Sequence, residues 1–249
     1  SPTTVEVPRL RTGPQTMIPP TVRKHFNIAG PCMADIHYML PPERRLSELE
    51  SLIESRQYFV LHAPRQTGKT TGMLALCHRL NAEGKYAALY VNVETAQPAG
   101  SDVAVAMPSI LHALRWEADR LLRPDMQPPS PDPSLPPADV LKAVLSAWAG
   151  NCPCPTVLFI DEIDALRDDT LLSVLRQLRS GYVDRPHGFP LSVCLIGLRD
   201  IRDYKVRIRP DSESLGTASP FNVITESLML RNFGADEVAE LYLQHTAET

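Results

Sequence analysis

The sequence predicts a three-layer α/β domain built around a parallel sheet, for three reasons. Short apolar runs alternate along the chain with longer segments whose apolar residues recur at helical spacing. The apolar runs lack polar residues at every other position, which is typical of strands covered by helices on both faces. The chain has 249 residues, 43% of them hydrophobic, so it can bury one large core.

Several segments have the length and composition of strands. Each is about four to eight residues long and apolar, which favours a strand over a buried helix. The expected strands are residues 58–62, 86–93, 156–160 and 191–198, followed by a short strand at 227–230.

Apolar residues spaced three and four apart predict helices between these strands. The expected helices cover residues 46–53, 69–84, 110–122, 138–149, 171–178 and 238–245. Pro108 is expected near the start of the third helix or at a kink in it. Gly150 is expected to stop the fourth, and Asp168 or Asp169 to cap the N-terminus of the fifth.

Proline is abundant, with 24 residues concentrated in two places. Residues 1–42 are too rich in proline for a long helix, so they are expected to form an extended arm whose later, apolar half packs on the domain. Residues 124–137 are predicted to be a loop for the same reason.

Charge and cysteine content exclude several classes of protein. A net charge of −4 provides no long-range attraction for nucleic acid or an anionic membrane. The five cysteines are odd in number, and Cys152-Pro-Cys154 has no second Cys/His pair to complete a zinc site, so free thiols are expected. With neither a signal peptide nor a membrane-spanning run, the sequence predicts a cytoplasmic protein.

A phosphate-binding turn is predicted at Ala63-Pro-Arg-Gln-Thr-Gly-Lys-Thr70, between an apolar strand and a helix. Gly68 allows the backbone N–H groups to curl inward toward phosphate oxygens, and the N-terminus of the next helix favours the same anion. Lys69 is expected to contact the β- and γ-phosphates, and Thr70 to ligate Mg²⁺. Ala63 stands where the motif has its first glycine. The predicted phosphate-binding residues are Ala63, Pro64, Arg65, Gln66, Thr67, Gly68, Lys69, Thr70 and Thr71.

An acidic pair follows the strand at residues 156–160. Ligands of open α/β sheets bind at the C-terminal ends of the strands, where Asp161 and Glu162 are expected to lie. Asp161 is the candidate that holds the magnesium through water, and Glu162 the candidate that polarises the attacking water. Asp164 is expected either to support this site or to cap the next turn.

Arginines follow the strand at residues 191–198. Arg199, with Arg202 second, is a candidate to stabilise charge on the transferred phosphoryl group, and a surface turn of Arg–Asp pairs is the alternative. The basic stretch 199–209 also contains aspartates, so a solvated face is favoured there over a nucleic-acid contact.

From these residues the chain resembles the AAA-like and STAND-type P-loop ATPases of bacteria and archaea, whose phosphate loop also reads Pro-Arg-Gln-x-Gly-Lys-Thr-Thr, here Pro64–Thr71. The resemblance implies an ASCE-type sheet in the order 5-1-4-3-2, binding of ATP with Mg²⁺, and a helical lid that begins near Phe233. It also implies that the segment from His25 to Tyr38 lies near the adenine, with Tyr38 stacking on the base. Members of the family usually couple this module to another domain.

We therefore expect a proline-rich arm at residues 1–42, a P-loop core at 43–225, and at 226–249 the start of a lid that the chain leaves incomplete. The predicted function is ATP binding and Mg²⁺-dependent hydrolysis that drives a partner protein or a further domain. A non-hydrolysing switch or scaffold remains an alternative, as does a helicase-like ATPase, since Asp161-Glu-Ile-Asp164 fits the Asp-Glu-x-Asp pattern. Arg176, Arg179 and Arg185 are candidates for an arginine finger in trans, although the polar face of a helix is preferred for the first two.

Overall fold

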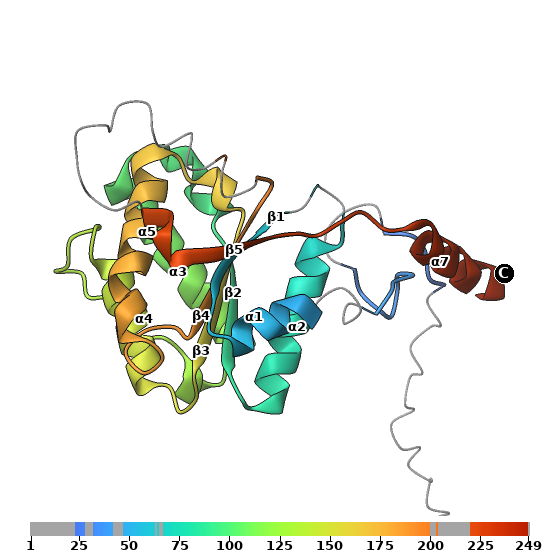
Figure 1. The fold of residues 1–249 in the computed structure, drawn as a ribbon, viewed down its shortest axis with the longest axis horizontal. Helices are drawn as coiled ribbons and strands as arrows, with labels where there is room; N and C mark the ends of the chain where they lie inside the picture. The colour runs from blue at the N-terminus through green and yellow to red at the C-terminus, as the bar shows by residue number, and fades with distance from the viewer. Residues whose placement is uncertain are drawn as a thin grey trace, which may run out of the picture.

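The computed structural model describes residues 23–27, 32–41, 47–62, 64, 67–199, 203 and 220–248. Figure 1 shows a central sheet with helices on both faces, and a separate helix at the C-terminal end that lies beside part of the N-terminal arm.

The sheet is fully parallel and has five strands in the order β2-β3-β4-β1-β5. This order confirms the arrangement that the family resemblance implies. Placing β1 between β4 and β5 puts the phosphate-binding turn between the C-terminal ends of these two strands. The strands are β1 (Tyr58–His62), β2 (Ala87–Asn92), β3 (Thr156–Asp161), β4 (Ser192–Gly197) and β5 (Ile224–Met229).

Each face of the sheet carries its own apolar core, because successive strand residues point to opposite faces. On one face the strands pack against α1 (Ser47–Glu54) and α2 (Lys69–Glu83). On the other face they pack against α3 (Val103–Leu121), α4 (Val140–Asn151) and α5 (Asp168–Gly181). The three-layer architecture predicted from the unbroken apolar runs is therefore confirmed.

Several helix ends differ from the sequence prediction. Helix α3 starts before Pro108, because the Asp102 carboxylate accepts hydrogen bonds from the amides of Ala104 (2.9 Å) and Val105 (3.2 Å) and caps an earlier first turn. Gly150 does not stop α4, which continues to Asn151. The cap of α5 is Arg167, without a side-chain hydrogen bond, and the two aspartates expected as caps lie inside its first turn.

Strand β5 is longer than expected and lies at the sheet edge. It pairs in parallel with β1 from Ile224 to Met229, with a register shift that leaves Thr225 between two paired residues. The sheet therefore extends past residue 225, where we expected the core to end. Immediately after β5, the amide of Leu230 donates to the carbonyl of His62, 3.0 Å away, so the chain leaves the sheet beside the phosphate-binding turn.

The proline-rich loop at residues 124–137 packs against α3 and α4. The Trp148 indole Nε1 donates to the Met126 carbonyl at 2.7 Å, and an Arg115 guanidinium nitrogen donates to the Pro128 carbonyl at 3.1 Å. Both Trp148 and Met126 are buried. The segment begins with a short 3₁₀ helix, η3 (Pro124–Met126), which the prediction of a loop did not include, and the rest has no helix or strand, as the prolines predicted. The two contacts fix where the loop lies.

The described part of the N-terminal arm packs on α7 (Ala235–Glu248) (Figure 1). The Phe26 ring lies 5.1 Å from the Tyr38 ring and 5.6 Å from the His245 ring, measured between centroids. The Gln244 side-chain amide donates to the Met39 carbonyl at 3.1 Å. Among the described residues, no helix is long and apolar enough to cross a membrane.

Replacing Gly181 with alanine is expected to destabilise the fold by about 1–3 kcal/mol. An added Cβ at this position would lie 2.3 Å from two ring atoms of Phe189, which is fully buried and cannot move without disturbing the core. Urea unfolding followed by circular dichroism measures the change. Gly150→Ala is the matched control, because its nearest neighbour is 3.8 Å away and alanine favours helix; equal stability of the two variants would contradict the packing argument.

Candidate nucleotide-binding site

The phosphate-binding turn joins β1 to α2. Gly68 lies at the N-terminus of α2 with φ 75° and ψ 13°, a left-handed conformation that favours glycine, and within the described residues no side chain caps the helix. The N–H groups of the first turn are therefore left for another acceptor. The Thr67 hydroxyl donates to the Pro64 carbonyl at 3.1 Å and closes the turn. Ala63, Arg65 and Gln66 lie outside the described residues.

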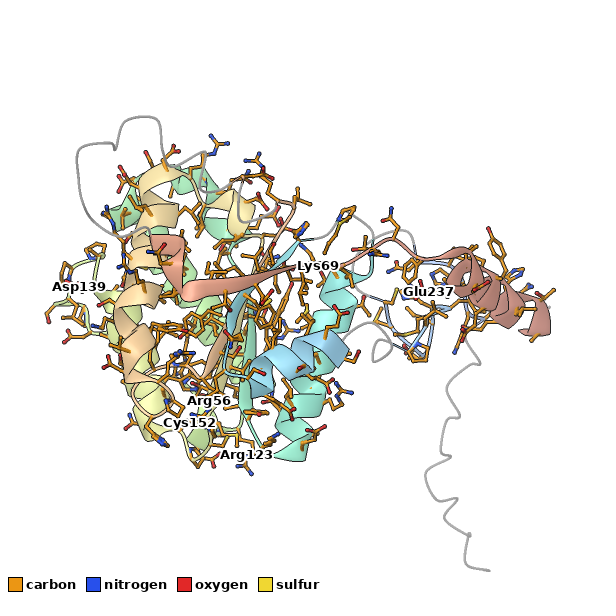
Figure 2. All side chains as sticks on the ribbon, in the orientation of Figure 1. Arg56, Lys69, Arg123, Asp139, Cys152 and Glu237 are labelled. Atoms are coloured by element: carbon orange, nitrogen blue, oxygen red, sulfur yellow. The ribbon has the colours of Figure 1, made fainter. Side chains whose placement is uncertain are left out.

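Lys69, labelled in Figure 2 at the start of α2, connects the turn with the acidic strand end. Its Nζ lies 2.9 Å from Asp161 Oδ1 and 3.6 Å from Glu162 Oε1. The side chains of Lys69 and Asp161 are 9% and 1% exposed, so the ion pair is shielded from solvent. Each buried charge therefore has a partner of opposite sign, which offsets the cost of removing it from water. The two acids predicted to act with Lys69 thus lie beside it.

Asp161 has partners on both carboxylate oxygens. Oδ1 accepts from the backbone amide of Glu162 at 2.8 Å in addition to Lys69. Oδ2 accepts from the Tyr90 hydroxyl at 2.5 Å. Burial raises the pKa of Tyr90 well above its usual range, with the Asp161 charge as the next cause, so the phenol stays protonated and keeps donating. The carboxylate orientation is therefore fixed before any ligand binds.

Tyr90 is a site residue that sequence reasoning missed. The Thr70 side chain also lies near this phenol, where it lowers the phenol's pKa against the burial and the Asp161 charge that raise it. Tyr90 thus connects the two residues predicted to bind the metal, Thr70 and Asp161. The available signal was its position near the end of β2, which pairs with β3 so that Asn92 lies opposite Asp161.

Glu162 has a left-handed backbone conformation, with φ 57° and ψ 40°. Positive φ is uncommon for residues other than glycine and concentrates at functional sites. The conformation turns the chain out of β3 into a short 3₁₀ helix, η4 (Ile163–Ala165). Its side chain is 35% exposed, against 1% for Asp161, so Glu162 can reach both Lys69 and solvent. A carboxylate that must contact a water molecule requires this kind of access.

Arg199 lies at the end of β4 and faces Asp164. The distance from Arg199 Nε to Asp164 Oδ1 is 3.6 Å, and the guanidinium is half exposed. The second oxygen of Asp164 accepts a hydrogen bond of 2.6 Å from the backbone amide of Leu198. Asp164 therefore lies between the acidic turn and the end of β4. Arg202 is outside the described residues.

Two contacts place the N-terminal arm and the last segment against the turn. The backbone amide of Cys32 donates to the Thr71 hydroxyl at 2.8 Å. A Cβ at Gly68 would lie 3.5 Å from the ring of Phe233, so this ring covers the turn. Tyr38 is buried among Phe26 and His245 rather than presented to solvent. Its role in base stacking stays a prediction.

The remaining candidates from the sequence have other surroundings. Cys152 and Cys154 are free thiols, and no cluster of three or more metal-ligating side chains occurs within the described ranges. The Arg185 guanidinium lies 3.5 Å from the centroid of the Tyr182 ring and donates to the carbonyl of Leu191 at 3.2 Å. These interactions hold Arg185 within its own chain, which does not favour an arginine finger. Arg176 is exposed on α5.

The donor set fits a magnesium–nucleotide complex. A carboxylate, a hydroxyl and a lysine ammonium meet at the uncapped N-terminus of α2, and oxygen ligands of this kind suit Mg²⁺. Thr70 and Asp161 would hold the metal, and the first-turn amides with Lys69 would hold phosphate oxygens. Bound Mg²⁺ would supply positive charge at the β- and γ-phosphate oxygens.

The fold occurs in solved structures of other proteins. A Walker-type ATPase of Pyrococcus abyssi superimposes with a TM-score of 0.55 at 14% identity, over 84% of this chain and 59% of that one. A chain in the structure of Drosophila ORC bound to AT-rich DNA and Cdc6 gives a TM-score of 0.53 at 12% identity, over 82% of this chain and 31% of that one. Both similarities establish the fold, and this chain spans less than two thirds of either protein chain.

A search among curated proteins finds no match. The sequence profile of a family described as an AAA domain matches residues 53–204. The matched segment is more than half of the chain and includes the phosphate-binding turn, the acidic strand end and Arg199. The chain therefore belongs to the AAA domain family of P-loop nucleotide-binding proteins.

Proposed function

We propose that this domain binds ATP with Mg²⁺ and hydrolyses it to ADP and phosphate. The observation that carries the proposal is the position of Lys69, which lies within 2.9 Å of Asp161 and 3.6 Å of Glu162 at the uncapped start of α2. A cation, a metal-binding carboxylate and a second, more exposed carboxylate at one helix N-terminus are the parts that phosphoryl transfer to water requires.

Each residue has a separate part in the proposed reaction. Lys69 would exchange its contacts with the two carboxylates for the β- and γ-phosphate oxygens, and Thr70 and Asp161 would hold the metal, with Asp161 oriented by the Tyr90 hydroxyl. Glu162, released from Lys69, accepts a proton from the attacking water. Arg199 stabilises negative charge on the γ-phosphate oxygens from the end of β4.

We further propose that the nucleotide state is passed to a partner protein or to a further domain. Support comes from the segment that leads into α7 and from the N-terminal arm, which contact the phosphate-binding turn through Phe233 and Cys32. Neither contact belongs to the sheet core. A nucleotide that reshapes the turn would therefore shift surfaces outside the core. ORC, to which the fold is similar, is a protein solved with DNA and Cdc6; the net charge of −4 here favours a protein as the partner.

The test is nucleotide binding and turnover by the purified protein. We expect a fluorescent ATP analogue to bind in magnesium buffer, to be displaced by ATP and ADP, and to bind more weakly with EDTA. Phosphate release should be slow, below the usual 1–100 s⁻¹ of phosphoryl-transfer enzymes, and should require Mg²⁺. Failure to bind any adenine nucleotide would refute the proposal. Tight binding without phosphate release would instead favour the non-hydrolysing switch.

A further inference from the structure

Asp164 connects two elements that carry different parts of the proposed reaction. It lies in η4, two residues after Glu162. Its Oδ2 accepts a hydrogen bond of 2.6 Å from the backbone amide of Leu198, which follows β4. This hydrogen bond joins the turn that carries the proposed base to the strand end that carries Arg199. The hydrogen bond has a charged acceptor and is largely shielded, since the Asp164 side chain is 13% exposed.

The other carboxylate oxygen faces Arg199. Oδ1 is buried and accepts no hydrogen bond from the described residues, which is a costly state for a charged oxygen. Arg199 Nε lies 3.6 Å from this oxygen. The distance is that of an ion pair, beyond a direct hydrogen bond. Asp164 therefore holds the backbone of β4 with one oxygen and the guanidinium with the other.

We propose that Asp164 is a positioning residue that sets Arg199 against the γ-phosphate, so that this domain distinguishes ATP from ADP through the Asp164–Arg199 pair. The inference rests on the proposed function, because it requires an adenine nucleotide in the site. It goes beyond that proposal in assigning the discrimination between nucleotides to a residue that touches no phosphate. A half-exposed arginine without Asp164 would sample many side-chain rotamers and lose much of its contact with the phosphate.

A purely structural role makes a different prediction. If Asp164 only caps the acidic turn, its replacement should lower thermal stability and raise the Kd values of both nucleotides by a similar factor. If it positions Arg199, its replacement should weaken the triphosphate selectively. The ratio of the Kd of ADP to the Kd of AMP-PNP, a non-hydrolysable ATP analogue, separates the two roles without any need for hydrolysis.

The experiment uses Asp164→Asn, Asp164→Ala, Arg199→Ala and the double variant Asp164→Asn/Arg199→Ala, with Kd values from titration calorimetry in magnesium buffer. Asparagine can still accept from the Leu198 amide, but it removes the charge that faces Arg199. We expect Asp164→Asn and Arg199→Ala each to reduce the ratio about tenfold, and the double variant to lose no more than either. Asp164→Ala should show the same loss with a lower Tm.

Asp125→Asn is the matched control. Asp125 also pairs with an arginine, Arg123, at 3.1 Å, but both side chains are exposed, and Arg123 lies far from Lys69 (Figure 2). This control should leave the ratio unchanged. A wild-type ratio in Asp164→Asn, or additive losses in the double variant, would overturn the inference while leaving the proposed function intact. If the wild-type protein binds neither nucleotide, the proposed function fails, and the inference fails with it.

Discussion

Replacing Lys69 with alanine is expected to weaken ATP binding by about two to three orders of magnitude. Truncating one member of a buried, hydrogen-bonded charge pair costs about 2–5 kcal/mol, and each 1.4 kcal/mol is a factor of about ten in Kd. Lys69 is the cation buried beside the start of α2, where it contacts Asp161 and Glu162. Titration of wild type and variant with a fluorescent ATP analogue measures the loss.

The Lys69 variant should also be less stable without nucleotide. Without the lysine ammonium, the buried Asp161 carboxylate has no cation beside it, and the nearby Glu162 carboxylate repels it. A lower Tm in nucleotide-free buffer is therefore expected. Lys85→Ala is the control, because Lys85 also contacts a carboxylate, Glu54 at 2.9 Å, but at the surface, where such pairs contribute little. If the Kd of the Lys69→Ala variant stayed within about threefold of the wild-type value, Lys69 would not contact the bound phosphates.

Replacing Glu162 with glutamine is expected to reduce phosphate release by about two to four orders of magnitude while nucleotide affinity stays close to that of wild type. Glutamine keeps the shape and the hydrogen-bonding oxygen of the side chain but cannot accept a proton from water. Loss of the second negative charge beside Lys69 should leave binding unchanged or slightly stronger. Single-turnover measurements with excess protein separate the chemical step from binding and product release.

A comparison with Asp161→Asn sharpens the assignment of Glu162. Asp161 is the proposed metal ligand, so its variant should raise the Mg²⁺ concentration required for binding, an effect that Glu162→Gln should not show. Glu117→Gln on α3, which disrupts an exposed contact with Arg120, serves as the neutral control. Equal phosphate release by wild type and Glu162→Gln would exclude Glu162 as the base.

The layers and the strands could be predicted from the sequence because their signal is local and strong. An apolar run such as residues 156–160 must be buried on both faces, and the observed strand, Thr156–Asp161, differs from it by one residue. Helix ends were less predictable because side chains compete for them. The Asp102 cap makes α3 begin at Val103, five residues before Pro108. The core contacts of α4 let that helix continue past Gly150 to Asn151.

The site was predictable in part for a related reason. Lys69, Asp161 and Glu162 belong to motifs of fixed local geometry, so their meeting followed once the strand order was known. Tyr90 could not be found in this way, because it is one apolar-looking residue in a buried strand and its partners come from two other elements. The link from Asp164 to Leu198 likewise depends on how β4 lies against η4, which no local pattern encodes.

The C-terminal helix α7 is connected to the nucleotide-binding site by contacts at both ends of the first turn of α2, Gly68 and Thr71. Phe233, two residues before α7, rests on Gly68, and the arm that packs on α7 is tied through Cys32 to Thr71. A small rotation of the first turn of α2 would therefore move both attachments at once. With 14 residues and a rise of about 1.5 Å per residue, α7 is roughly 20 Å long, so its far end would move more than the attached end. If the domain binds nucleotide as proposed, occupation of the phosphate site is therefore expected to displace α7 relative to the sheet.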